Sequence, residues 1–136
     1  MMKYLYSIFL VLILATGCGK DEGYIPDVPV NYNVTLTEFS IKAVNNVLVV
    51  SGYGVGGLLV VKTPLGTYVA FDRCSTVNPE KICKVTPDDS GVTATDACSG
   101  AKFSLLDGSP QKAPAERSLK SYNVSVQGNT LIHVSN

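Results

Sequence analysis

One stretch, ATDACSGAKF at residues 94–103, decides the fold of this chain. It places a cysteine and a glycine between two segments, 91–95 and 101–105, in which apolar and polar residues alternate. Alternation with a period of two is typical of a half-buried β-strand. Small polar residues and glycine between two such segments favour a loop. The stretch therefore predicts two β-strands joined by a loop that carries Cys98.

The same short period extends over the chain from Val30 onward. Runs rich in β-branched residues indicate further strands, and Thr63–Gly66 and Gln127–Asn129 have the composition of hairpin turns. No stretch of about ten residues in this part has helical periodicity. The sequence therefore predicts an all-β domain, a small sandwich or barrel of short antiparallel strands. The expected strands are 34–39, 47–50, 58–61, 67–71, 91–95, 101–105, 122–126 and 130–134.

The composition limits both the size and the function of the protein. The chain has 136 residues, which is enough for one small domain. Its 11 basic and 11 acidic residues give a formal net charge of zero, whereas a nucleic-acid-binding domain needs an excess of basic residues. A single His excludes any site built from several histidines. We therefore expect no nucleic-acid partner and no histidine-rich metal site.

The first residues have the parts of a secretion signal. Lys3 is followed by the apolar core Tyr4–Leu14, which is too short for a membrane span of roughly 20 residues. Small residues precede Cys18, and the sequence ATGC at 15–18 resembles the lipobox of bacterial lipoproteins. That resemblance implies cleavage before Cys18 and attachment of lipid to its side chain.

The segment that follows Cys18 indicates a location. The sequence GKDE at 19–22 resembles the signal that some Gram-negative bacteria use to send lipoproteins to the cell surface. We expect a lipid-anchored protein of the bacterial outer membrane, on its periplasmic side or at the cell surface. Its expected partner is the membrane, through the anchor, with an envelope protein as a further candidate. The expected organisation is a signal peptide at 1–17, a tether at 18–29 and one β domain at 30–136.

Three patterns that look like functional sites have plainer explanations. GYGVGG at 52–57 fits the dinucleotide motif G-x-G-x-x-G, but a strand-like run follows where that motif needs a helix, so we interpret it as a turn or bulge. Asp88–Gly91 is too poor in carboxylates for an EF-hand and fits a tight turn. His133 alternates with two apolar neighbours in the last expected strand, so we expect it to face solvent. We predict no catalytic residue, no metal site and no enzymatic activity.

The region 68–122 resembles the Rieske iron–sulfur domain. That family has a Cys-x-His loop, a Cys-x-x-His-Gly-x-x-Phe loop and a later Gly-Pro-Ala-x-x-x-Leu-x-x-Tyr stretch. The matching residues in this chain are Phe103, Gly108, Pro114, Ala115, Leu119 and Tyr122. The resemblance covers roughly residues 57–135 and implies a Rieske-like all-β fold. Together with the alternation, it predicts four core residues, Phe103, Leu105, Leu119 and Tyr122.

The cluster ligands of that family are largely replaced in this chain. A Rieske cluster has two Cys on one iron and two His on the other. Aligning the GAKF segment with the family's Gly-x-x-Phe puts Asp96 at a Cys ligand and Ser99 at a His ligand. In the first loop, Cys74 lies at or within one residue of the Cys ligand, and Thr76 or Val77 takes the place of the His. We therefore expect the protein to hold no cofactor and no metal.

The resemblance also bears on the remaining cysteines. With Cys18 acylated and the envelope oxidising, Cys74, Cys83 and Cys98 should form one disulfide and leave one thiol. Cys98 falls where many family members have a Cys that ties the two cluster loops together. Cys83 suits the partner position best, and Cys74 is the competitor.

The expected function is a non-enzymatic envelope lipoprotein whose Rieske-like scaffold has lost its 2Fe–2S cluster. Such a scaffold would serve binding or assembly, through the loop around Tyr53 and through the two disulfide-tied loops. The alternative function is electron transfer through an atypical 2Fe–2S centre. Its ligands would be Cys74, Cys83, Asp96 and Cys98.

Overall fold

A computed structural model of the chain describes residues 25–136. The expected signal peptide, Cys18 and the first part of the tether lie outside these residues. Within residues 25–136, no helix is long and apolar enough to cross a membrane.

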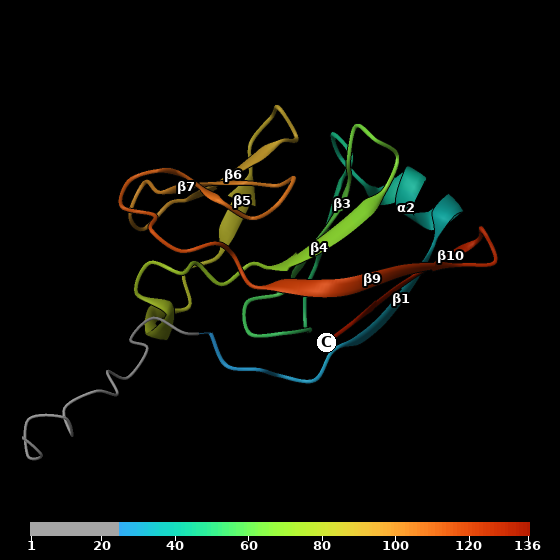
Figure 1. The fold of residues 1–136 in the computed structure, drawn as a ribbon, viewed down its shortest axis with the longest axis horizontal. Helices are drawn as coiled ribbons and strands as arrows, with labels where there is room; N and C mark the ends of the chain where they lie inside the picture. Colours follow the sequence, from blue (N-terminus) through green and yellow to red (C-terminus); the bar gives the residue numbers. More distant parts are fainter. Residues whose placement is uncertain (1–24) are drawn as a thin grey trace, which may run out of the picture.

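The described chain folds into two antiparallel sheets (Figure 1). The larger sheet has the strand order β1-β10-β9-β4-β3-β2, and the smaller one has the order β5-β6-β7-β8. This arrangement confirms the predicted all-β fold. The strands of the larger sheet are β1 Asn31–Thr35, β2 Val47–Val50, β3 Leu58–Lys62, β4 Tyr68–Asp72, β9 Ser121–Gln127 and β10 Leu131–Ser135. The smaller sheet contains β5 Val85–Pro87, β6 Thr93–Asp96, β7 Lys102–Ser104 and β8 Pro110–Lys112.

Strand β3 shows how the sequence builds two cores. Its run LLVV is buried on both faces, with Leu58 and Val60 in one apolar cluster and Leu59 and Val61 in the other. Alternate side chains of a strand point to opposite faces, so one strand can serve two cores. The first core is formed by residues of the larger sheet and of the helix Leu36–Lys42, and the second core lies between the two sheets. Three of the predicted core residues, Phe103, Leu105 and Leu119, belong to the second core, and Tyr122 belongs to the first.

The expected strand at 34–39 is wrong beyond Thr35. A helix, α2, occupies Leu36–Lys42 and buries Phe39. The Thr35 hydroxyl accepts a hydrogen bond from the Glu38 backbone N–H at 3.0 Å and so caps the helix start. The spacing Thr-x-x-Glu is that of a capping box, and Lys42 lies in the last turn, where the helix dipole favours a cation. The alternation also ends at Thr37, and Leu36 and Phe39 have the i, i+3 spacing of one face of a helix.

The turns behave as predicted. Thr63–Gly66 joins β3 to β4 through a Gly66 N–H to Thr63 C=O bond of 2.9 Å. Gln127–Asn129 joins β9 to β10, with the Thr130 N–H bonded to the Gln127 C=O at 3.1 Å. Both turns place glycine at a positive φ, which an L side chain adopts with strain.

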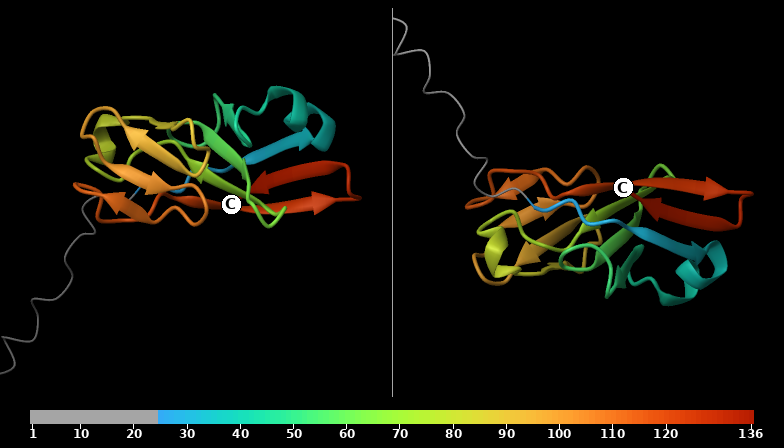
Figure 2. Two further views of the ribbon diagram at one scale, coloured as in Figure 1. Left: turned by 90° about the horizontal axis from the view of Figure 1, so that it is seen from above. Right: turned by 90° about the horizontal axis from the view of Figure 1, so that it is seen from below.

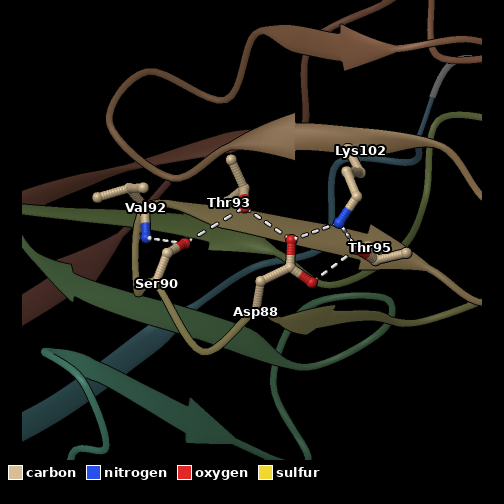
Figure 3. Close-up of polar contacts among 6 residues, drawn as sticks. All are labelled: Asp88, Ser90, Val92, Thr93, Thr95 and Lys102. Atoms are coloured by element: carbon tan, nitrogen blue, oxygen red, sulfur yellow. Dashed lines mark hydrogen bonds and ion pairs between the residues drawn. The ribbon is translucent and has the colours of Figure 1, made fainter.

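Asp88 confirms the turn interpretation of its segment. The Gly91 N–H donates to the Asp88 C=O at 3.0 Å and closes a tight turn before β6. Figure 3 shows that the Asp88 carboxylate accepts bonds from the hydroxyls of Thr93 and Thr95, at 2.6 and 2.7 Å, and from Lys102 Nζ at 2.8 Å. The protein's own groups thus satisfy this carboxylate, and they tie β5, β6 and β7 together.

Arg73 joins the two sheets directly after β4. Its N–H donates to the Gly57 C=O at 2.8 Å, and its C=O accepts the Val85 N–H at 2.7 Å. Its side-chain Nε then donates to the Val85 C=O at 3.1 Å. The outward N–H and C=O of Val85, the first residue of the edge strand β5, are therefore occupied. Pro87, farther along β5, has no N–H to offer.

The outer edge of β2 is covered at its first residue. The chain turns back before β2, and Val44 exchanges two backbone hydrogen bonds with Val47, at 2.9 and 3.0 Å. The smaller sheet ends on β8, whose first residue is Pro110. These devices limit the unpaired backbone groups on the rims of both sheets.

Residues 25–30 run along the domain and are held by its other terminus. The Asn136 side chain donates to the Val28 C=O at 2.8 Å and to the Asp27 carboxylate at 3.1 Å, and it accepts the Val30 N–H. Lys120 pairs with Asp27 at 2.6 Å. Figure 2 shows that this lead-in starts at the end of the molecule where the smaller sheet lies, away from the β9–β10 hairpin and α2.

Candidate functional site

Two loops meet at that end of the domain, and we call them the tip loops. The first, residues 73–84, connects β4 to β5 and contains the 3-10 turn Pro79–Lys81; the second, residues 97–101, connects β6 to β7. Cys83 and Cys98 form a disulfide between them, with an S–S distance of 2.10 Å and a Cα–Cα distance of 6.3 Å. Of the two partners that the sequence left open for Cys98, the structure pairs it with Cys83 rather than with Cys74. Cys74 is left as a buried thiol.

Asp96 is the buried carboxylate beneath the second tip loop. Its Oδ1 accepts the Cys98 N–H at 2.9 Å, its Oδ2 accepts the Ser99 hydroxyl at 2.7 Å, and the Ser75 side chain also hydrogen-bonds to it. Burial acts to raise the pKa of Asp96, but the hydrogen bonds from Ser99 and Ser75 outweigh it and hold that pKa below its usual value. The carboxylate is therefore ionised and connects the two loops.

Asp72 is a second buried carboxylate, at the end of β4. It accepts the backbone N–H groups of Val55, Gly56 and Cys74 at 2.7, 2.8 and 2.8 Å. The Tyr122 hydroxyl donates to it at 2.7 Å. Burial and this bond raise the pKa of Tyr122, so the phenol stays protonated. Asp72 thus fixes the loop at 51–57 against the start of the first tip loop.

The glycines of GYGVGG are explained by this close approach. A Cβ on Gly54 would lie 2.4 Å from Asp72 Oδ2 and 2.7 Å from the Tyr122 oxygen, and Gly54 has a φ of +62°. A Cβ on Gly56 would lie 2.6 Å from the Cys74 nitrogen. The motif forms a turn between β2 and β3, as predicted. Gly54 makes room for a buried carboxylate of the same chain, and Gly56 makes room for the backbone of Cys74.

Cys74 does not point to the second tip loop. Its Sγ lies 3.5 Å from the Pro79 carbonyl oxygen and 3.7 Å from that of Ser75. Burial, followed by the negative charges of Asp72 and Asp96, raises the pKa of the Cys74 thiol to about 11. The group is a protonated thiol at neutral pH and is a poor nucleophile.

The structure brings together only part of the predicted ligand set. Asp96 and Ser99 are in contact, but their partner from the first tip loop is Ser75, the residue after Cys74. The Thr76 hydroxyl instead donates to the Arg117 C=O at 2.8 Å and ties the first loop to the segment before β9. Sequence reasoning did not single out Ser75 or Asp72. The available signal for Ser75 was its place within one residue of Cys74.

His133 lies outside the tip loops. It is in β10, between the buried residues Ile132 and Val134, and its Nδ1 is 2.6 Å from Asn33 Oδ1 in β1. Its side chain is half-buried and pairs with the neighbouring strand, on the opposite face from those two core residues. The site at the tip loops is therefore built without an imidazole.

Two antiparallel sheets, two loops tied by a disulfide, and a Tyr in β9 that reaches the base of the first loop define a Rieske-like domain. Among solved structures, the chain is similar to the cyanobacterial plasma membrane Rieske protein PetC3 from Synechocystis PCC 6803. The sequences are 25% identical, the match covers 81% of this chain and 99% of that one, and the TM-score is 0.58.

Two further solved structures share the fold alone. One is a chain of the complex of reduced oxygenase and oxidized ferredoxin in carbazole 1,9a-dioxygenase, at 19% identity and a TM-score of 0.57, covering 78% of this chain and 93% of that one. The other is the ferredoxin of carbazole 1,9a-dioxygenase from Nocardioides aromaticivorans IC177, at 14% identity and a TM-score of 0.52, covering 81% of this chain and 100% of that one. No protein-family model and no curated protein sequence matches the chain significantly.

These likenesses correct the expectation of no cofactor. Rieske domains are 2Fe–2S domains, and the neighbour that is 25% identical to this chain is described as a Rieske protein. The comparisons therefore favour the 2Fe–2S alternative over an absence of cofactor.

The donor set of the tip loops nevertheless differs from that of an ordinary Rieske centre, which needs two Cys and two His. Cys83 and Cys98 are bonded to each other, and the thiol of Cys74 faces the Pro79 carbonyl. The single imidazole is in β10. As arranged here, these residues do not fit a cluster with the usual Rieske ligands.

Proposed function

We propose that the protein is a lipoprotein of the bacterial outer membrane whose Rieske-like domain acts as a non-enzymatic binding or structural module. The observation that carries the proposal is the way in which the tip loops are held. A disulfide joins them, and two buried carboxylates, Asp72 and Asp96, bind the backbone at the base of each loop. A surface that is already ordered loses less entropy when it binds a partner.

The surface that such a module offers includes exposed apolar side chains. Ile82, at the end of the 3-10 turn, is 46% exposed. Tyr53 is 36% exposed and packs edge-to-face on Tyr32, with ring centroids 5.0 Å apart. Large apolar or aromatic side chains on ordered loops are frequent anchors in protein interfaces. We take an envelope protein as the partner.

Site-specific photo-crosslinking in cells tests the module. A photoreactive residue at Ile82 or at Tyr53 should give a discrete adduct of higher mass. The same residue at Leu65, which is 90% exposed on the β3–β4 turn, serves as the matched control and should give none. Equal adducts from all three positions, or adducts from none, would contradict a binding role for the tip loops and the loop at 51–57.

The lipid anchor is tested separately with Cys18→Ala. The variant should remain uncleaved or be released as a soluble form, because the acylated residue is missing. The measurement is the partition of the protein between membrane and soluble fractions, together with its mass. Membrane partition of the variant at the processed mass would contradict the anchor.

A second candidate function is electron transfer through a 2Fe–2S centre, and the likeness to a Rieske protein favours it. The thiols available for such a centre are those of Cys74, Cys83 and Cys98, with Asp96 beside them. Anaerobic purification followed by iron and sulfide analysis tests this candidate. About two irons and two sulfides per chain, with a reversible change of the visible spectrum on reduction, would support it. Substoichiometric iron without sulfide would count against it.

A further inference from the structure

Three ligand atoms cluster where the tip loops meet. The Sγ atoms of Cys83 and Cys98 and a carboxylate oxygen of Asp96 lie within 4.8 Å of one another. In the oxidised protein the two sulfurs share a covalent bond. We propose that reduction of this disulfide opens a mononuclear site for a thiophilic divalent cation of the Zn²⁺ class, bound by two thiolates and one carboxylate. This site is independent of the proposed function.

The spacing of the two cysteines suits a shared metal. Their Cα atoms are 6.3 Å apart. A thiolate binds Zn²⁺ at about 2.3 Å, so two sulfurs on one tetrahedral ion are roughly 3.7 Å apart. Rotation of the side chains supplies most of that increase over the S–S bond. Cys98 is exposed and the nearby Gly100 has no atom within 4 Å of its Cβ position, so the second loop has room to adjust.

Hydrogen bonds hold the Asp96 carboxylate beside the two sulfurs. The bonds from the Cys98 N–H and the Ser99 hydroxyl hold one each of its two oxygens, at 2.9 and 2.7 Å. The Ser75 side chain also hydrogen-bonds to this carboxylate, so a cation bound to one of its oxygens would take the place of one of these donors. Outer hydrogen bonds of this kind orient a metal ligand and strengthen binding.

The chemistry balances with a thiol reductant. Two reductant thiols, or one dithiol, give two electrons to the Cys83–Cys98 bond and become a disulfide, while the two cysteines become thiols. Binding of the cation then releases two protons to solvent as the thiolates form. Cys98 is exposed and Cys83 is half-buried, so both the reductant and the ion can reach the sulfurs.

The donor types define the class of ion. Two soft thiolates with one carboxylate suit Zn²⁺ or Cd²⁺, whereas Mg²⁺ and Ca²⁺ require oxygen ligands. Three protein ligands leave a fourth position for water. Cys74 is not part of this set, because its thiol faces the Pro79 carbonyl. It therefore provides a matched control cysteine.

The test uses the full chain, reduced anaerobically with excess phosphine, incubated with Zn²⁺ alone and then desalted. We expect about one zinc per reduced chain and less than a tenth of that in the oxidised chain. Cd²⁺ should add a thiolate charge-transfer band in the ultraviolet. Cys83→Ser should abolish both signals, Cys74→Ser should keep both, and Asp96→Asn should weaken zinc affinity at least tenfold.

Each contrary result overturns the proposal. These are no zinc on the reduced chain, one zinc on Cys83→Ser, or unchanged affinity in Asp96→Asn. Thermal melts followed by circular dichroism cover the case in which reduction unfolds the domain. Zinc should then restore the fold or raise the Tm of the reduced wild type but not of Cys83→Ser, because a ligand that binds only the folded state stabilises it. A failure of zinc to do so contradicts the site.

Discussion

The larger sheet and the tip are held by different forces. Strands of four to seven residues build the larger sheet and bury an apolar cluster that includes Val34, Leu58 and Ile132. The smaller sheet has strands of only three or four residues, and its loops depend on a disulfide and on two buried carboxylates. Apolar burial is indifferent to pH and to reductants, whereas carboxylates respond to pH and disulfides respond to reductants. We therefore expect the stability of the tip loops to depend on pH and on reductants more than the stability of the larger sheet does.

The largest effect is expected where the two regions meet. Phe103 is fully buried in the core between the sheets. Phe103→Ala should lower the free energy of unfolding by about 3–5 kcal/mol, through lost apolar burial and the cavity left behind. Leu65→Ala, at a position 90% exposed, should change it by less than about 0.5 kcal/mol. Denaturant unfolding measures both changes. A cost below about 1 kcal/mol for Phe103→Ala would mean that the core between the sheets does not stabilise the tip.

Reduction of the Cys83–Cys98 disulfide tests whether the tip loops and the larger sheet are stabilised independently. The bridge spans 15 residues of sequence. Its loss should cost about 3 kcal/mol, because the unfolded chain gains freedom. Hydrogen exchange should then show weaker protection in residues 73–84 and 97–101, with β3 and β10 still protected. Cys74→Ala keeps the bridge and should leave the response to reductant unchanged. Equal loss of protection in β10 would show that the two regions are not independent.

Two glycine substitutions separate close packing from backbone strain. Gly54 and Gly66 both have positive φ, at +62° and +80°, but only a Cβ on Gly54 would clash, with Asp72 and Tyr122. Gly66→Ala should cost about 1 kcal/mol from strain alone. Gly54→Ala should cost about 1–3 kcal/mol more, because it overpacks a buried carboxylate. Equal midpoints in urea would contradict the tight contact around Asp72.

The smallest expected effect is the acid sensitivity of Asp96. Its pKa is lower in the folded protein than its usual value, so the stability it contributes is complete above the unfolded pKa, about 3.9. That contribution is lost as the pH falls through the folded pKa. The free energy of unfolding should therefore decline less steeply below about pH 4 in Asp96→Asn than in the wild type. Parallel curves for the two proteins would contradict a charged Asp96 at the tip.

The alternating pattern predicted most of the larger sheet because its strands are long enough to repeat a period of two. Val47–Val50 matches β2 to the residue, and β3, β4, β9 and β10 differ from the expectation by a residue or so at an end. Strands β5 and β8 have three residues each, including a proline, which is too short to display a period. The helix α2 was missed because the alternation holds only over residues 34–37, whereas Leu36 and Phe39 have the i, i+3 spacing of a helix.

The part of the site that lies at a fixed sequence spacing from a recognisable motif was predictable. The Gly-x-x-Phe spacing places Asp96, Cys98 and Ser99, and the structure brings these residues together around one carboxylate. The first tip loop has no comparable spacing, so the sequence pointed to Cys74, whereas the contact is made by Ser75. Asp72 could not be singled out, because its donors come from segments distant in sequence, at Val55 and Tyr122.

The partial cover on the edges of the two sheets has a consequence for aggregation. An open strand edge invites a second molecule to extend the sheet, which is how native β-proteins begin to aggregate. Here Val44 folds back on β2, Arg73 occupies the outward groups of Val85, and prolines stand in β5 and β8. Each of these contacts and prolines removes a backbone group with which a second molecule could pair.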